Sequence, residues 1–477
     1  MRAVVGVDSG TQSTKVEVRE LETGRVLGRG SAPHPATTPP RSEQQPHDWW
    51  QAFERAFADA WSAAGAAADS PLELAGISVG GQQHGMVALD SACDVLRPAK
   101  LWNDTETAPD AGWLVGQLPG GAADWAAAVG SVPVAAFTVT KLSWLHRSEP
   151  DVWARLAHVL LPHDWLTHCL TGELVTDRGD ASGTGYWSPS TGEYRWDVLG
   201  IVDGDRDWST VVPRVAQPLE VVGHWRGAPV ACGTGDNMAA ALGLGLVDGT
   251  AVVSLGTSGT AYARSATSSA DPLGEVAGFC DATGGFLPLV CTLNATKVTD
   301  TMAALLGLGR DEFDAAALAA PLGAAGVSLL PYFDGERTPN RPRATGWMSG
   351  LRSGTGREQL ARAAVEGVCC GLLDALDALV AVTPVDRVVL VGGGARSHAY
   401  RSVFSALCHL PVAVAEAEEA VATGACVQAA AVAAGLTHQQ IGERWALGAV
   451  AQLPASDDAD AARAVRDRYA ALRAAAS

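Results

Sequence analysis

The chain is poor in lysine and in positive charge of any kind. Of its 477 residues, 34 are Lys or Arg and 52 are Asp or Glu, which gives a formal net charge of −18, and only four residues are lysines. A surface of this sign repels nucleic-acid backbones and anionic lipid, so neither is expected as a principal partner. A small anionic ligand in a local site is compatible with this charge, and a lysine in a glycine-rich loop is a candidate to hold one.

The sequence also lacks paired cysteines and long apolar runs. Its nine cysteines are an odd number without Cys-x-x-Cys spacing, which favours reduced thiols in a cytoplasmic protein. The first apolar run stops at Asp8, too early for the core of a signal peptide. A long uncharged stretch, residues 315–333, contains two prolines and indicates a soluble helix and loop rather than a membrane span.

Length and pattern predict two or three domains of α/β type. A chain of 477 residues with 47% hydrophobic side chains can bury a core in each domain. Helical spacing of apolar residues over 49–61 and 357–380 alternates with β-rich runs such as 387–391, which indicates sheet-based domains. We expect a boundary near the glycines at 243–249 and a polar, alanine-rich surface helix from residue 455 onward.

A strand–turn–strand pattern occurs twice. Residues 3–19 form two β-rich runs around a glycine turn, and residues 250–263 repeat the pattern. Overlaying Gly10 on Gly256 aligns the two predicted hairpins, about half a chain apart. Such an internal match is what a duplicated domain leaves in a sequence.

Each hairpin turn is a candidate phosphate site. The first turn carries Asp8, several hydroxyl groups and Lys15. Backbone N–H groups in such a turn can hold a phosphate, and a nearby carboxylate can hold Mg²⁺ through water. An ordinary tight hairpin explains either turn alone, whereas two such turns, one per domain, can clamp a polyphosphate.

A third glycine-rich segment, GGGARS at residues 392–397, follows a buried strand and precedes a helix. Its glycines allow a ligand or another part of the backbone to approach this turn closely. A close-packed turn between strand and helix, without a ligand, is an equally good interpretation. The segment lacks the third glycine of the dinucleotide fingerprint. The chain contains no Gly-Lys pair, which excludes a Walker-type loop.

Asp236 is the candidate general base. It lies in GTGDN at residues 233–237, directly before an apolar run at 238–242. This pattern predicts a helix that starts at the aspartate, where N–H groups of the helix end stabilise a carboxylate suited to accept a hydroxyl proton. Simple capping of the helix by Asp236 is the structural alternative.

A polar and aromatic set in the first half is typical of polyol recognition, with amides for hydroxyl groups and an indole for a C–H face. The set comprises Gln82, Gln83, Trp102, Asn103 and Asp104. His84 belongs to the same glycine turn, and without a second His or Cys at ligand spacing it does not indicate zinc. A satisfied structural histidine is the alternative. The segment GISVG at 76–80 matches a nucleophile elbow around Ser78, but it leads into a second strand, so we interpret the match as chance.

The order of these motifs over residues 1–436 resembles the FGGY carbohydrate kinases, which share the actin/hexokinase-like ATPase fold. The motifs are DSGT at 8–11, GDN at 235–237, SLGTSG at 254–259, LPYFDGERTP at 330–339, EG at 366–367 and GGGARS at 392–397. The resemblance implies an α/β fold of two duplicated actin/hexokinase-like (ribonuclease H-like) domains with a cleft between them. We expect residues 1–245 to bind the sugar and to carry the first phosphate turn and the base. Residues 246–440 are expected to bind ATP, and residues 441–477 to form a helical extension.

Further segments resemble family members that act on D-xylulose. They are SEQ at 42–44 with WW at 49–50, GQQHG at 81–85, LWND at 101–104, TKL at 140–142 and LPHD at 161–164. At Gln83 we expect methionine in that pattern. The departure leaves open whether position 83 contacts the sugar through its side chain or its backbone.

The motifs and the resemblance together assign the expected roles. Asp236 is the catalytic base, and Asp8 lies near Mg²⁺. The expected sugar-binding residues are Gln83, His84, Trp102, Asn103, Asp236 and Asn237. The expected ATP-binding residues are Gly10, Thr11, Lys15, Gly256, Thr257, Ser258, Gly393, Gly394, Ala395 and Ser397.

The implied activity is transfer of the γ-phosphate of MgATP to O5 of D-xylulose, in xylose catabolism. The alternatives are a kinase for another pentulose or polyol, such as ribulose, gluconate or glycerol, an actin-like ATPase, and a serine hydrolase that uses Ser78. Because the two phosphate turns lie in different halves, we expect the halves to close around the ligands about a hinge near residues 243–249. The oligomeric state is left open, a homodimer included.

Overall fold

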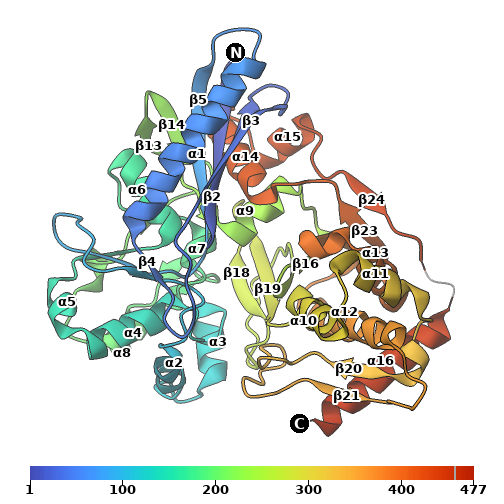
Figure 1. Cartoon of the computed structure of the whole chain (residues 1–477). Coiled ribbons are helices and arrows are strands. Elements are labelled where there is room, and N and C mark those ends of the chain that lie inside the picture. The colour runs from blue at the N-terminus through green and yellow to red at the C-terminus, as the bar shows by residue number, and fades with distance from the viewer. Residues whose placement is uncertain (456–457, 477) are drawn as a thin grey trace. The chain divides into compact units, whose positions relative to one another are not determined.

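The computed structural model describes residues 1–455 and 458–476, which divide into two units made of discontinuous segments. Unit 1 comprises Met1–Leu246, Ala266–Leu287 and Ala417–Ala449, and unit 2 comprises Val247–Ser265, Pro288–Glu416 and Val450–Ser477. In Figure 1 the red helices α14 (Ala420–Ala434) and α15 (His438–Arg444) therefore belong with the blue N-terminal strands of unit 1.

Unit 1 is built on one sheet with the strand order β13-β14-β5-β1-β2-β3 and with β15 beside β5. β1 pairs antiparallel with β2 and parallel with β5, which places Asp8 opposite Lys15 on one side and Gly80 on the other. The strands are β1 (Arg2–Ser9), β2 (Ser13–Glu20), β3 (Val26–Pro33), β5 (Glu73–Gly81), β13 (Val221–Trp225), β14 (Ala228–Ala231) and β15 (Thr234–Gly235).

Helices cover both faces of this sheet, because successive strand residues point to opposite faces and apolar ones occur on each. On one face α1 (Pro46–Ala67) buries Trp49 and Phe53 in the core that contains Val5 and Val7. On the other face α14 packs on β1 and β5, and Val427 joins the core that contains Val4.

α9 (Asp236–Gly243) crosses α14 at a pair of glycines. A Cβ on Gly243 would overlap the carbonyl of Ala420, and a Cβ on Gly424 would overlap that of Ala239. Only glycine permits this approach of two helices. The pair therefore sets the position of α9, and with it the position of Asp236 at its first turn.

Short helices and small sheets complete unit 1. The helices are α2 (Ala108–Val115), α3 (Ala122–Val129), α4 (Thr138–Ser148), α5 (Pro150–Arg155), α6 (Pro162–Thr171), α7 (Arg178–Ala181), α8 (Trp196–Val202) and the 3-10 turn η1 (Trp208–Thr210). The small sheets pair β4 (Glu43–Gln44) with β7 (Ala99–Lys100), β6 (Val87–Leu89) with β8 (His158–Leu160), β9 (Val175–Thr176) with β12 (Arg214–Val215), and β10 (Trp187–Ser188) with β11 (Glu193–Tyr194). β18 (Ala277–Cys280) lies in the segment of unit 1 that follows residue 265.

Unit 2 repeats the arrangement of β1, β2 and β5. β16 (Gly249–Leu255) pairs antiparallel with β17 (Gly259–Ala263) and parallel with β22 (Val385–Val391), within the order β19-β17-β16-β22-β23-β24. The other strands are β19 (Phe286–Thr292), β20 (Ser328–Leu330), β21 (Trp347–Ser349), β23 (Val412–Ala415) and β24 (Val450–Gln452). The helices are α10 (Thr296–Leu306), α11 (Arg310–Ala319), α12 (Arg357–Val380), α13 (His398–Leu407), α16 (Ala459–Ala475), η2 (Ala324–Gly326) and η3 (Gly393–Arg396).

The two hairpins expected from the sequence are confirmed, and so is the duplicated α/β fold. The long helix expected over 357–380 coincides with α12. β5 runs through the GISVG segment and on into the glycine turn around His84, because Gly80 and Gly81 pair with β1 and β15. The helix expected from 455 onward begins at Ala459, and residues 456–457 lie outside the described residues.

All nine cysteines are free thiols, as the missing Cys-x-x-Cys spacing predicts. Within residues 1–455 and 458–476, no single helix is long and apolar enough to cross a membrane. α14 and α15 meet the length and composition required only as a pair, and the chain bends by 108° between them.

Candidate active site

Asp236 is the first residue of α9, and Gly235 is the N-cap. The structural alternative, in which Asp236 caps the helix, is therefore wrong. Its Oδ1 accepts hydrogen bonds from the backbone N–H and from Nδ2 of Asn237, each at 2.8 Å. In the part of the chain that the structure describes, Oδ2 accepts no hydrogen bond. One oxygen of the carboxylate is thus held in place, and the other is available.

The surroundings of Asp236 tune its proton affinity. Burial, followed by the negative charges of Asp8 and Asp180, raises the pKa of Asp236 to about 7, against the lowering effect of the donors of Asn237. A carboxyl group with this pKa exchanges protons near neutral pH. This is the property that a general base for a hydroxyl nucleophile requires.

Asp8 lies near the end of β1, across the hairpin from Lys15. Burial raises the pKa of Asp8 to about 6, while Lys15 lowers it and Glu419 raises it. Among the described residues the Asp8 carboxylate accepts no hydrogen bond. Partly buried carboxylate oxygens without a donor fit a hard cation such as Mg²⁺.

Lys15, expected at the phosphate, is held by a neighbour. Its Nζ donates to Oε2 of Glu419 at 2.7 Å, and the side chain is 41% exposed. Glu419 directly precedes α14, so the ion pair joins the first hairpin to that helix. The role of Lys15 in ATP binding stays a prediction.

Gln83 and His84 follow β5, next to the base. Oε1 of Gln83 accepts a hydrogen bond from Nδ2 of Asn237 at 3.0 Å. Nε2 of Gln83 is buried and has no partner among the described residues. Two segments that the sequence singled out, GQQHG at 81–85 and GTGDN at 233–237, therefore meet.

His84 has a left-handed backbone conformation, with φ of 66°. Its Nδ1 donates to the carbonyl oxygen of Gly183 at 2.8 Å, and its ring packs against Phe137 and Phe279 at centroid distances of 5.0 and 5.6 Å. Because a carbonyl only accepts, Nδ1 carries the proton, and in the neutral ring Nε2 keeps its lone pair.

A chain of hydrogen bonds joins the expected sugar residues to the first phosphate turn. Nε1 of Trp102 donates to Oγ1 of Thr11 at 2.9 Å, and Thr11 donates to Oε1 of Gln82 at 3.2 Å. Nε2 of Gln82 donates to the carbonyl of Gly10 at 3.4 Å. Beside Trp102, the Oδ1 atom of Asn103 is buried without a partner among the described residues. Residues expected to bind sugar and phosphate thus lie together in unit 1.

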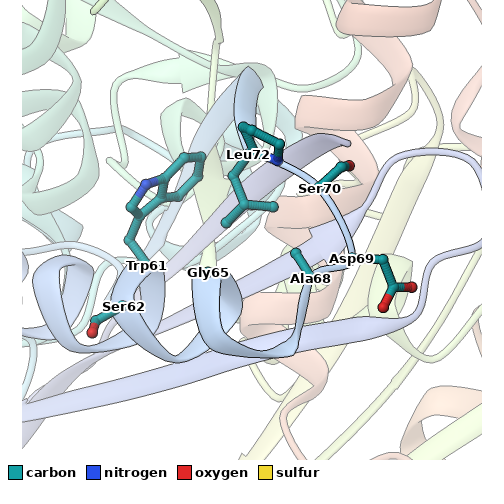
Figure 2. A pocket seen from close by; sticks show the side chains of 8 residues that line it. Trp61, Ser62, Gly65, Ala68, Asp69, Ser70 and Leu72 are labelled. Carbon is teal, nitrogen blue, oxygen red and sulfur yellow. The ribbon is translucent and has the colours of Figure 1, made fainter.

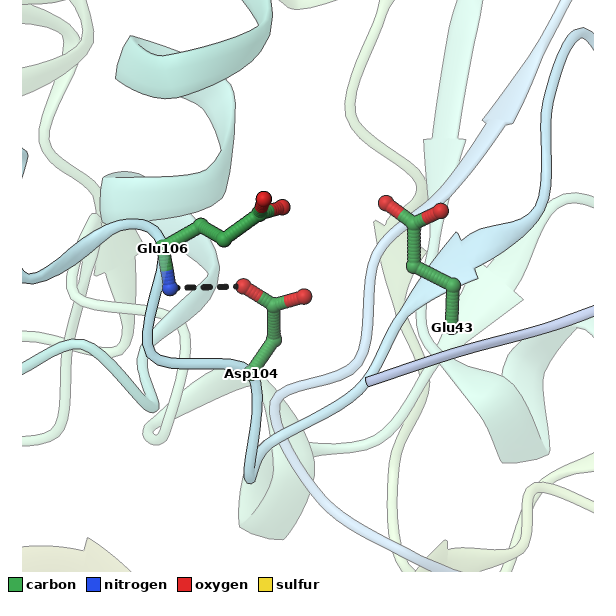
Figure 3. A group of neighbouring side chains, drawn as sticks. All are labelled: Glu43, Asp104 and Glu106. Carbon is green, nitrogen blue, oxygen red and sulfur yellow. Dashed lines mark hydrogen bonds between the residues drawn. The ribbon is translucent and has the colours of Figure 1, made fainter. Parts of the chain in front are cut away.

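Three carboxylates, two of which closely follow Trp102 and Asn103 in the chain, have a geometry that could suit a metal ion. Oxygens of Glu43, Asp104 and Glu106 lie within 4.8 Å of one another, and Figure 3 shows their arrangement. Nζ of the fully buried Lys100 fills the space between them, at 3.1, 2.9 and 2.7 Å respectively. The ring of Trp144 is 3.9 Å from the same ammonium. The group is an ion-pair cluster, and we assign no metal to it.

The Lys100 cluster supports the loop that carries Trp102 and Asn103. Asp104 accepts hydrogen bonds from the backbone N–H groups of Ser42 at 2.9 Å and Glu106 at 3.0 Å. The loop is thereby fixed at its base. The sequence marked Asp104 as a polar sugar-site residue, but the structure uses it as a buried anchor.

A second buried cluster surrounds His163, a residue of the LPHD segment to which the sequence assigned no role of its own. Nδ1 lies 2.7 Å from Asp180, and Nε2 lies 3.2 Å from Asp164 and 3.6 Å from Asp177. Burial favours the neutral ring, but the three carboxylates raise the pKa of His163 to about 9. The raised pKa favours the imidazolium form of His163. Asp177 also accepts from Oγ1 of Thr234 at 2.7 Å, which ties the cluster to the strand before the base.

The candidate nucleotide segments of unit 2 differ in exposure. The turn after β16 is closed by a hydrogen bond from the Gly256 N–H to the Ser258 carbonyl at 3.1 Å. The first hairpin, whose turn is one residue longer, has a bond from the Gly10 N–H to the Ser13 carbonyl at 3.1 Å. The side chains of Thr257 and Ser258 are exposed. A phosphate could approach both the backbone and the hydroxyl groups of this turn.

In the segment 392–397 the glycines have different surroundings. A Cβ on Gly393 would meet no atom within 4 Å, whereas one on Gly394 would contact Leu255. Ala395 is buried, and Ser397 caps α13 by accepting from the Tyr400 N–H. The open position is therefore Gly393, and the other three residues expected at the nucleotide also hold the turn together.

One surface hollow of about 460 Å³ lies at the end of α1, as Figure 2 shows. It is lined by Trp61, Ser62, Gly65, Ala68, Asp69, Ser70, Pro71 and Leu72. None of these residues was expected in the site, and only Asp69 is charged. We assign no function to it.

Comparison with known families decides the class of protein. Residues 3–243 match the N-terminal domain of the FGGY family of carbohydrate kinases, and residues 251–433 match its C-terminal domain. The chain belongs to the FGGY family of carbohydrate kinases. This confirms the resemblance of the motifs, and it makes the protein a sugar kinase.

Individual similar proteins extend this result. The chain is 47% identical over 453 residues to the xylulose kinase of Streptomyces rubiginosus, covering 93% of this chain and 90% of the relative. The crystal structure of xylulose kinase from Bifidobacterium adolescentis is 37% identical, with a TM-score of 0.85 and 99% of each chain covered. A gluconate kinase from Lactobacillus acidophilus, 22% identical, also has a TM-score of 0.89. The fold alone therefore does not distinguish a xylulose kinase from a gluconate kinase.

The serine-hydrolase alternative is excluded by the position of Ser78. This serine lies in the middle of β5, is fully buried, and donates to Oε1 of Gln428 at 2.9 Å. A nucleophile elbow needs an exposed serine at a turn between a strand and a helix. The match of GISVG is chance, and it does not compete with the FGGY assignment.

Proposed function

We propose that this protein transfers the γ-phosphate of ATP to O5 of D-xylulose, giving D-xylulose 5-phosphate and ADP, a step of xylose catabolism. The xylulose kinases at 47% and 37% identity support this sugar. The observation that carries the chemistry is the carboxylate of Asp236. It stands at a helix start, with Oδ1 held by Asn237 and a pKa of about 7.

In this proposal Oδ2 of Asp236 accepts the proton of the O5 hydroxyl. The sugar oxygen bonds to the γ-phosphorus while the bond from that phosphorus to the ADP oxygen breaks, and the proton then passes from Asp236 to solvent. The transition state of phosphoryl transfer is loose, so positioning and charge matter more than covalent help from the protein. The N–H groups at the start of α9 favour the ionised form that must accept the proton.

The sugar contacts in the proposal come from unit 1. Nε2 of Gln83 and Oδ1 of Asn103 are buried polar atoms without partners among the described residues, and they suit sugar hydroxyl groups. The indole N–H of Trp102 is already used on Thr11, so its ring is left to pack on a C–H face. His84 and Asn237 complete the set.

ATP takes its contacts from three turns. Gly10, Thr11 and Lys15 in unit 1, and Gly256, Thr257 and Ser258 in unit 2, supply N–H, hydroxyl and ammonium groups for the phosphates. Gly393, Gly394, Ala395 and Ser397 belong to the segment proposed for adenosine. Asp8 is the residue that would hold Mg²⁺, which when bound offsets charge on the phosphates.

The proposed compartment is the cytoplasm. All nine cysteines are free thiols, and five of them are buried. Such a pattern is typical of proteins that fold and work in a reducing environment.

The substrate is tested by phosphate transfer from labelled ATP to D-xylulose, D-ribulose, gluconate and glycerol, with Mg²⁺ and with excess chelator. We expect the highest kcat/KM for D-xylulose, ³¹P NMR of the product with phosphate on O5, and no transfer in chelator. A higher kcat/KM for another acceptor would show that D-xylulose is not the preferred substrate, while the assignment as a kinase would stand. ATP hydrolysis without transfer to any acceptor would contradict the proposed function.

A further inference from the structure

The side-chain amide of Gln83 lies between the two residues that flank the proposed base. Its Oε1 accepts from Nδ2 of Asn237, the residue after Asp236. Its carbon chain lies against Gly235, the residue before Asp236, where a Cβ would meet Cγ of Gln83 at 2.7 Å. Gln83 itself is only 4% exposed. A glycine at 235 therefore makes the room that this glutamine occupies.

The chemistry of the contacts fixes the orientation of both amides. Oδ1 of Asp236 is an acceptor, so the atom of Asn237 that faces it at 2.8 Å must be the nitrogen. The same nitrogen faces Gln83 at 3.0 Å, so the atom of Gln83 at that contact must be the oxygen. Both hydrogens of the Asn237 amide nitrogen are then used, one on Gln83 and one on Asp236.

This arrangement acts on the carboxylate. With its second hydrogen anchored on Gln83, the Asn237 amide cannot rotate about its side chain without losing a hydrogen bond. It therefore keeps its other hydrogen on Oδ1 of Asp236, where the backbone N–H of Asn237 also donates. The carboxylate is held in one orientation, with Oδ2 directed away from both donors.

We propose that Gln83 is a positioning residue for phosphoryl transfer, whose Oε1 holds the Asn237 amide so that Oδ1 of Asp236 stays occupied and Oδ2 stays available to the sugar hydroxyl. The inference rests on the proposed function of Asp236 as the base. It adds a role for the side chain of position 83 that is separate from any contact with the sugar.

Gln83→Met tests the role, because methionine keeps the length of the chain but removes the acceptor. The loss of one neutral hydrogen bond predicts a kcat about 3- to 10-fold lower with D-xylulose, and an unchanged KM for ATP. A double-mutant cycle with Asn237→Ala separates positioning from packing. Once Asn237 is removed, Gln83→Met should change kcat by less than about 2-fold.

Gln82→Met is the matched control, because Gln82 bonds Thr11 and Gly10 and not Asn237. Its effect on kcat should be equal in the presence and absence of Asn237. A normal kcat for Gln83→Met, or an equal loss in both backgrounds, would overturn the proposal. Gln83→Leu repeats the cycle if the methionine variant fails to fold, as judged by circular dichroism.

An NMR measurement that does not depend on turnover tests this inference separately from the proposed function. The side-chain ¹⁵N–¹H signal of Asn237 is assigned by its loss in Asn237→Ala, and Gln83→Met should shift it while Gln82→Met leaves it in place. An Asn237 signal that Gln83→Met does not move contradicts the positioning role whatever the enzyme phosphorylates. A shifted signal in a protein that phosphorylates no sugar would instead overturn the proposed function alone.

Discussion

At the scale of single residues, the environment of Asp236 decides how the site can work. The residue combines a helix start, partial burial and the nearby negative charges of Asp8 and Asp180. The first feature stabilises the carboxylate, and the other two favour its protonated form. The balance is a pKa of about 7, at which the group can both accept a proton and release it.

The pH dependence of kcat/KM for D-xylulose should report this carboxyl group. A base acts only in its ionised form, and since the pKa of Asp236 is raised to about 7, kcat/KM should fall as the pH drops below 7. An aspartate with an ordinary pKa, near 4, would keep full activity down to about pH 5. Steady-state kinetics between about pH 5 and 9 measure the profile. A flat profile from about pH 5 to 7 would contradict the assigned base.

Some site residues are predictable from sequence and others are not, for a physical reason. Asp8 and Asp236 stand out because each is the single acid in a short glycine-rich turn. The contact of Gln83 with Asn237 joins positions 154 apart and becomes visible only in the fold. Lys100 and His163 looked ordinary because burial among carboxylates, which gives them a structural role, has no local sequence pattern.

At the scale of elements, glycine positions predicted the hairpin turns well and were misleading at one strand end. The hairpins and α12 match the sequence expectation, because apolar spacing and turn residues agree there. The end of β5 does not, because Gly80 and Gly81 continue the ladder by pairing with β1 and β15. The packing of α14 on the first sheet depends on glycine contacts between distant segments, which no local pattern reveals.

The loop after β7 depends on one buried cation, which predicts a large effect of Lys100→Met. The change leaves Glu43, Asp104 and Glu106 without their shared partner, and removing one member of a buried ion pair costs about 3–5 kcal/mol. We expect a clear drop in the melting temperature measured by calorimetry. Lys297→Met is the matched control, because its pair with Asp334 is solvent-exposed and worth about 0–1 kcal/mol.

Adding Ca²⁺ in the Lys100 experiment tests whether the three carboxylates bind a metal ion. Ca²⁺ should leave the melting temperature of the natural protein unchanged, because the ammonium fills the space between the carboxylates. It should raise that of Lys100→Met, in which three oxygens within 4.8 Å have lost their cation. Stabilisation of the natural protein by Ca²⁺ at this cluster would contradict its description as an ion-pair cluster.

At the scale of the whole molecule, duplication and family membership agree. Each unit contains an antiparallel hairpin whose first strand is parallel to a later one, and the FGGY domains match residues 3–243 and 251–433. The sequence predicted this architecture because the two hairpin turns are alike. The closure of the two halves, and the assignment of sugar and ATP to separate domains, stay predictions.

The central claim is that this chain is a sugar kinase with Asp236 as its base, and the Asp236→Asn variant tests it most directly. Asparagine keeps the shape of the side chain but cannot accept the hydroxyl proton. Turnover of D-xylulose by the folded variant, measured with labelled ATP, should fall by on the order of 10²–10⁴, while calorimetry still detects ATP binding. Near-normal turnover in a properly folded variant that binds ATP would contradict the account.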